Sequence, residues 1–199
     1  MAENKRLESD AFAVITRHEG FKPEPYLDTN KKWTIGIGTL IGDGSDKALK
    51  ASPYYGKKID RPTAEKIATK AMGEKIKLIN RLVGSEKFGS FSPELQAQLV
   101  SGAYRGDITQ SPKAIKLLKQ GNYEAAAKEY LDFDEYKNAD KNNASGIRTR
   151  MDEAAAVMAS EAKRAPAKPA VKPSVKPASF LDAVDKRYLE YSKVMSGPQ

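Results

Sequence analysis

Two carboxylic acids near the N-terminus have the neighbours needed for acid–base chemistry on a sugar. Glu19 precedes Gly20 at the expected end of a helix, and Asp28 lies beside polar residues at the end of an expected strand. Hydrolysis of a glycosidic bond uses one carboxylic acid to protonate the leaving oxygen and a second carboxylate on the other face of the sugar. The negative end of a helix dipole favours a protonated carboxyl group, so Glu19 is the expected acid and Asp28 the ionised partner.

This pair is a weak signal by itself, because most acids in a chain with 26 of them lie on the solvated surface. The following run, residues 33–40, adds a hydroxyl group and two glycines. With a period of two, Thr34, Gly36 and Gly38 share one face of a strand and the apolar residues share the other. Missing side chains let a ligand approach the backbone, so we expect the glycine face to form the wall of a cleft.

Local signals predict the elements that position these residues. Apolar residues at helical spacing, with Ser9 as the cap, predict a helix from about Ser9 to Glu19. Residues 25–29 and 33–40 flank a polar turn and predict a β-hairpin, and residues 42–58 are expected to form a loop of uncertain structure. Asp60 and Pro62 predict the start of a long helix over about residues 61–83 that connects two lobes.

The remainder divides into a helical part and an extended tail. Helical periodicity continues over about residues 84–163, so we expect an α+β domain over residues 1–163 with a small N-terminal lobe (residues 1–60), a short antiparallel sheet and an all-helical C-terminal lobe. Residues 164–178 are a Pro/Ala/Lys linker that favours extended conformations. Residues 179–199 contain a short amphipathic segment that is expected to need a partner surface.

Composition excludes several classes of protein. With no cysteine and His18 as the only histidine, a zinc site of the usual ligands cannot be assembled, and we expect neither a metal nor a cofactor. No apolar stretch approaches the roughly 20 residues of a membrane span. The net charge of +8 favours an anionic partner, and four of the excess positive charges lie in the linker.

Three segments in order resemble the N-terminal signature of the phage-type lysozymes, muramidases that resemble glycoside hydrolase family 24. They are Ile15-Thr16-Arg17-His18-Glu19-Gly20-Phe21, Pro25-Tyr26-Leu27-Asp28-Thr29 and Trp33-Thr34-Ile35-Gly36-Ile37-Gly38. The resemblance continues more weakly to about Glu161, through segments that begin at Asp60, Tyr123 and Gly146. It implies a lysozyme-like fold.

The resemblance implies roles residue by residue. Glu19 would be the general acid, Asp28 the carboxylate that activates water and Thr34 the hydroxyl that holds this water, with inversion at the anomeric carbon. An arginine that pairs with the catalytic acid would be Arg150, or else Arg148. The residues expected to bind substrate or to support the site are Tyr26, Gly36, Gly38, Tyr104, Arg105, Arg150 and Arg148.

The chain departs from the family pattern at two places. Many relatives have histidine after the Thr-Ile-Gly-x-Gly strand, where this chain has Thr39. Where relatives often carry Phe-Asn-x-Gly, this chain has Ala103-Tyr104-Arg105-Gly106. Substrate subsites are therefore expected to differ. His18 could tune Glu19, although a partly buried helix residue is the simpler interpretation.

These observations predict a peptidoglycan-degrading muramidase made in the host cytoplasm. Two roles are possible for it. It is either a lysozyme carried in the phage virion or a free endolysin that stays in the host cytoplasm until it is released to the cell wall. The linker and tail favour the virion, with Phe180, Leu181, Val184, Tyr188 and Leu189 bound to another virion protein, or else folded back on the helical lobe. A catalytically silent virion protein and a basic nucleic-acid-binding module are alternatives of other classes.

Overall fold

A computed structural model of the chain describes residues 2–18, 20–28, 30–139 and 145–164. The chain divides into two compact units, residues 1–165 and residues 166–199, and the second unit lies outside the described residues. The predicted linker from residue 165 onward and the predicted amphipathic segment therefore also lie outside them. None of the described helices has the length and apolar character of a membrane span.

The first helix, α1, spans Ala2–His18 and begins earlier than predicted. Ser9 does not cap this helix, because it lies in the middle of it. The residues before Ser9 are good helix formers, and Leu7 among them is buried in the core. Tertiary packing of Leu7 thus extends the helix beyond the local start signal.

A three-stranded antiparallel sheet follows α1, with strand order β1-β2-β3. Its strands are β1 (Lys22–Leu27), β2 (Trp33–Gly36) and β3 (Thr39–Gly42). The prediction of one strand over residues 33–40 is wrong, because the chain turns at Ile37 and Gly38. Gly36 and Gly38 have φ angles of 67° and 68°, which other residues rarely adopt, and these angles turn the chain into β3.

The segment after the sheet is more ordered than the sequence suggested. The predicted loop over residues 42–58 contains helix α2 (Asp46–Ala51), which begins at an N-cap Ser45. Helix α3 (Arg61–Val83) has the predicted start, since the Asp60 side chain accepts a hydrogen bond from the Thr63 main-chain N–H and Pro62 lies in the first turn. Strands β2 and β3 pack on α3.

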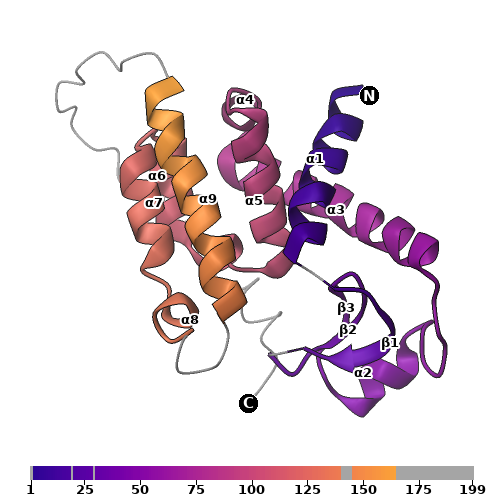
Figure 1. Cartoon of the computed structure of the whole chain (residues 1–199). Helices are drawn as coiled ribbons and strands as arrows, with labels where there is room; N and C mark the ends of the chain where they lie inside the picture. The colour runs from indigo at the N-terminus through magenta and orange to yellow at the C-terminus, as the bar shows by residue number, and fades with distance from the viewer. Residues whose placement is uncertain (1, 19, 29, 140–144, 165–199) are drawn as a thin grey trace, which may run out of the picture. The chain divides into compact units, whose positions relative to one another are not determined.

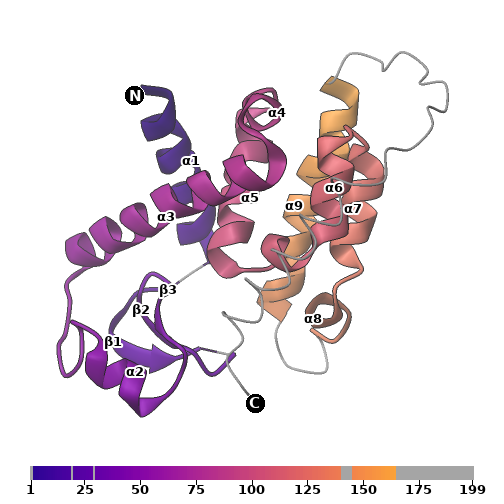
Figure 2. The same cartoon turned by 180° about the vertical axis from the view of Figure 1, so that it is seen from behind.

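The rest of the described chain is helical. Figures 1 and 2 show α3 running past the sheet to the later helices, with α6, α7 and α9 close together beyond α5. The elements after α3 are α4 (Ser85–Gly89), α5 (Pro93–Arg105), the 3-10 helix η1 (Ile108–Gln110), α6 (Pro112–Lys119), α7 (Tyr123–Leu131), α8 (Asp134–Lys137) and α9 (Ser145–Arg164). The α+β class with an N-terminal sheet and later helices is confirmed.

Helix α5 is the central helix of this part. It contacts α1, α3 and α9, and every residue from Ala97 to Ala103 is buried. A helix that is buried on all sides needs close neighbours on all sides. At Gly102 a Cβ atom would lie 2.7 Å from the Asp107 carboxylate, so the absence of a side chain allows η1 to pack there.

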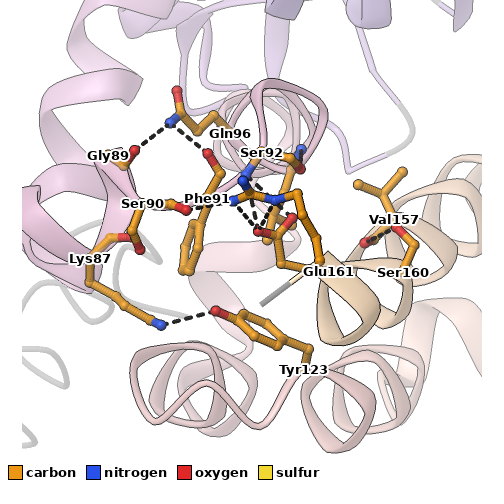
Figure 3. Close-up of polar contacts among 12 residues, drawn as sticks. Lys87, Gly89, Ser90, Phe91, Ser92, Gln96, Tyr123, Val157, Ser160 and Glu161 are labelled. Atoms are coloured by element: carbon orange, nitrogen blue, oxygen red, sulfur yellow. Dashed lines mark hydrogen bonds and ion pairs between the residues drawn. The ribbon is translucent and has the colours of Figure 1, made fainter. Parts of the chain in front are cut away.

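A buried carboxylate joins the end of α9 to the start of α5 (Figure 3). Glu161 is 2% exposed and accepts a hydrogen bond from the main-chain N–H of Ser92 at 3.1 Å. The Arg164 guanidinium donates two more hydrogen bonds to Glu161, at 2.9 Å and 2.6 Å. The Ser92 hydroxyl in turn accepts a hydrogen bond from the Leu95 N–H as the N-cap of α5. A buried charge with these partners is satisfied and fixes both helix ends.

Glu161→Gln is expected to lower the free energy of unfolding by about 2 kcal/mol, because the hydrogen bonds it weakens are charge-assisted. Urea titration followed by circular dichroism measures the change. Glu86→Gln is the matched control, since Glu86 is exposed on α4, and its effect should stay within about 0.5 kcal/mol. Equal effects of the two substitutions would contradict a stabilising role for Glu161.

Candidate active site

The Asp28 carboxylate is fixed by the turn that follows β1. Its Oδ1 atom accepts hydrogen bonds from the main-chain N–H groups of Asn30 at 2.9 Å and Lys32 at 2.8 Å. The main chain closes the same turn, because the Asp28 N–H donates to the Lys32 carbonyl at 2.9 Å. Lys31 adopts a φ of 57°, which is uncommon for a residue with a side chain. The turn therefore orients the carboxylate before any ligand arrives.

The Thr34 hydroxyl lies beside the other oxygen of this carboxylate. Thr34 Oγ1 is 3.4 Å from Asp28 Oδ2 and 3.3 Å from the Lys32 carbonyl oxygen. Both distances are at the long end of the hydrogen-bond range, so neither contact saturates the hydroxyl group. The backbone pairing of Tyr26 with Thr34 across β1 and β2 fixes the position of Thr34 relative to the end of β1. Two of the three predicted catalytic side chains are thus brought together.

The loop between β3 and α2 supports the Asp28 turn from outside. Gly44 has a φ of 95°, and a Cβ atom on it would lie 2.0 Å from the Lys31 carbonyl oxygen. Trp33 Nε1 donates a hydrogen bond to the Ser45 carbonyl at 3.1 Å. The sequence predicts only a loop over residues 42–58, so sequence reasoning misses this support. The signal was present in Ser45, which could have been interpreted as the cap of a short helix.

The predicted acid, Glu19, lies outside the described residues. The described chain ends helix α1 at His18 and resumes at Gly20, before β1 begins at Lys22. The assignment of Glu19 as the proton donor therefore stays a prediction from the sequence.

The two candidate arginines lie in the first turns of α9 and are half-buried. The Arg148 guanidinium lies over the Tyr136 ring, with its carbon 5.3 Å from the ring centroid. The Tyr136 hydroxyl donates a hydrogen bond to Asp152 Oδ1 at 2.6 Å. Arg150 lies close to Gly146, where a Cβ atom would be 3.6 Å from Arg150 Nη1. The two contacts of Tyr136 tie α8 to the start of α9, whereas the contact of Arg150 lies within α9.

Arg105 is held within the helical part. Its guanidinium donates hydrogen bonds to the Ser101 hydroxyl at 2.6 Å and to Asp107 Oδ2 at 3.1 Å. Burial is the strongest single influence and acts to lower the pKa of Arg105, but the charges of Asp107 and Tyr130 and the hydrogen bonds to both together raise that pKa. Burial also raises the pKa of the neighbouring Tyr130 hydroxyl well above its ordinary value. These contacts give Arg105 a structural role at the end of α5.

Three further predicted site residues lie in or next to the sheet. Gly36 approaches α3, and a Cβ atom there would lie 2.8 Å from the Ala64 Cβ. Close packing against α3 thus accounts for the absence of a side chain at Gly36, and contact with a ligand is not needed to explain it. Tyr26 is half-buried, with the Lys22 ammonium 3.9 Å from its ring centroid. Gly38 lies in the turn between β2 and β3.

Sequence reasoning missed one acid whose pKa depends on the charge of Asp28. Glu135 lies on α8 and is half-buried. Burial raises the pKa of Glu135, and the negative charges of Asp107 and Asp28 raise it further, against the opposing charge of Lys32. The charge of Asp28 therefore acts on a carboxyl group that belongs to α8. Among the side chains that the structure describes, no group of three or more His, Asp or Glu could hold a metal ion.

Comparison with known protein families identifies a family for most of this chain. Residues 16–154 match the sequence model of a family described as phage lysozyme, which covers more than half of the chain. The match includes Asp28, Thr34 and both candidate arginines. No curated protein matches the chain.

Asp28→Asn is expected to lower the pKa of Glu135, because it removes one of the negative charges that raise it. A raised folded-state pKa means that the fold favours protonated Glu135. Stability is therefore lost as the pH rises from below the ordinary glutamate pKa through the folded pKa, and Glu135→Gln should abolish this loss. NMR titration of the Glu135 carboxyl carbon measures the shift. Asp134→Asn on the same helix is the control, and an equal shift from it would contradict proximity to Asp28.

Proposed function

Because the chain belongs to the phage lysozyme family, we propose that it hydrolyses the β-1,4 bond between N-acetylmuramic acid and N-acetylglucosamine with inversion. The family supports the coarser conclusion that the protein is a peptidoglycan-hydrolysing muramidase. The proposal for bond and stereochemistry depends on one observation above all. Asp28 Oδ2 and Thr34 Oγ1 lie 3.4 Å apart, and both could bind the same water molecule.

The proposed reaction is a single displacement at the anomeric carbon. Asp28 Oδ2 accepts a proton from a water held by Thr34 Oγ1, and the water oxygen forms a bond to the anomeric carbon as the glycosidic carbon–oxygen bond breaks. Glu19 donates its proton to the departing oxygen of the neighbouring sugar. Fixation of Asp28 Oδ1 by the turn leaves Oδ2 for this role, since a preoriented base loses little freedom in the transition state.

The positive charge of the chain suits this substrate. Bacterial envelopes carry anionic polymers, and a net charge of +8 favours association with them. The same charge would also suit a basic nucleic-acid-binding module, so it is the family match that favours the muramidase.

Glu19→Gln is expected to lower the rate of reducing-sugar release from peptidoglycan by at least about 100-fold, because the amide cannot donate the proton. Circular dichroism and the melting temperature check that the variant folds. Glu124→Gln, an exposed carboxyl group on α7, is the control and should be fully active. NMR of the first product formed by the wild type should show the α-anomer. A β-anomer would exclude inversion, and a fully active Glu19→Gln enzyme would exclude Glu19 as the acid.

For deployment, we propose that the phage particle carries the enzyme for penetration of the cell wall. The support is in the sequence: an extended Pro/Lys linker would hold the apolar residues of the tail away from the enzyme. A free endolysin needs no docking segment. The partner would be another virion protein that binds Phe180, Leu181, Val184, Tyr188 and Leu189.

Truncation after Pro177 tests this deployment. The expected result is unchanged lytic activity and melting temperature, together with loss of the protein from purified particles. Quantitative immunoblotting of particles measures incorporation, with a replacement of residues 178–199 by a Gly/Ser segment of equal length as the matched control. A large drop in melting temperature with preserved incorporation would instead favour a tail that folds back on the enzyme.

A further inference from the structure

The Tyr104 hydroxyl, in the last turn of α5, contacts the turn between β2 and β3. It donates a hydrogen bond to the Ile37 carbonyl at 2.8 Å and lies 2.7 Å from the Thr39 hydroxyl. A tyrosine hydroxyl carries one proton, which is used on Ile37, so Thr39 donates the second hydrogen bond. Thr39 is 6% exposed and Tyr104 is half-buried, so solvent competes weakly for these groups.

These hydrogen bonds join two parts of the protein that are distant in sequence. Tyr104 lies 65 residues after Thr39. On the sheet side, Thr39 pairs with Ile35 and Leu40 pairs with Thr34, so the β2–β3 ladder connects the contact directly to Thr34. On the other side, α5 is packed against α1 and α9. The contact therefore relates the position of Thr34 to that of the helical part.

We propose that Tyr104 is a positioning residue whose hydroxyl holds the β2–β3 turn against α5. It thereby sets the distance between the Asp28–Thr34 pair and the helices packed around α5. The catalytic meaning of this contact depends on the proposed function, but the distance that it sets can be measured without any activity.

The absence of cysteine in the chain makes this measurement direct. Spin labels at Lys50→Cys on α2 and Lys119→Cys on α6 report the separation of the sheet side from the helical part, because both positions are exposed. Pulsed electron–electron double resonance on the full chain should give one narrow distribution of the distance between the two labels. Tyr104→Phe removes both hydrogen bonds and should broaden the distribution. Thr39→Val removes one of them and should broaden it less.

Matched variants separate positioning from general destabilisation. Thr39→Ser keeps the hydroxyl group and should retain the parent distribution, and Tyr55→Phe, at an exposed tyrosine, should leave it unchanged. The combined Tyr104→Phe and Thr39→Val variant should behave like Tyr104→Phe alone. All comparisons are made at a temperature at which every variant is folded by circular dichroism.

Activity provides the second readout. A misplaced water-activating pair should lower kcat by about tenfold in Tyr104→Phe with little change in KM, and Thr39→Ser should restore what Thr39→Val loses. Unchanged distance distributions in both Tyr104→Phe and Thr39→Val would overturn the proposal. If Tyr104→Phe failed to fold, the comparison of Thr39→Val with Thr39→Ser would decide it. If the distances change in the variants but the parent protein itself releases no sugar, the positioning contact is supported and the proposed function is refuted.

Discussion

The site depends on the two main-chain N–H groups that hold the Asp28 carboxylate. A carboxylate on a free surface loop samples many orientations, whereas the hydrogen bonds from Asn30 and Lys32 leave Asp28 essentially one. This arrangement makes demands on its surroundings. Lys31 must adopt a left-handed conformation, and residue 44 must lack a side chain because its Cβ would overlap the Lys31 carbonyl. Strain in the turn is thus supported by the loop that packs over it.

The sheet that carries this turn is small and gains its position from helices. Gly36 permits close contact with Ala64 on α3, and the Tyr104 hydroxyl holds the turn that follows. The first contact is a close apolar approach, whereas the second is a pair of directional hydrogen bonds. Together they place Thr34 with respect to two different helices, so the sheet need not be large to be well positioned.

Helix α5 is suited to this purpose because buried charges fix both of its ends. At its start, the Glu161 carboxylate accepts a hydrogen bond from Ser92 and is paired with Arg164. At its end, Arg105 is paired with Asp107 beside the buried Tyr130. The Arg105–Asp107 pair is largely buried, whereas the Arg164 partner of the buried Glu161 is half-exposed. A buried charge that lost its partner would be costly, so these contacts specify one arrangement. Tyr104 therefore projects from a helix with little freedom to shift.

The sequence alone determined the features that depend on residues close together in the chain, such as helix caps and motifs. Asp60 and Pro62 begin α3 where they were expected to, since a cap acts over three residues, and the ordered motifs around Asp28 and Thr34 indicated the family. Glu19 stays a prediction from those motifs. Tertiary structure decided the rest. Period-two reasoning placed Thr34, Gly36 and Gly38 on one face, but positive φ angles turn the chain at Ile37 and Gly38, and Thr34 is buried. The effect of the Asp28 charge on Glu135 and the hydrogen bond between Tyr104 and Thr39 relate residues that are far apart in the chain. No local pattern encodes such contacts, because they exist only when separate helices and strands pack together.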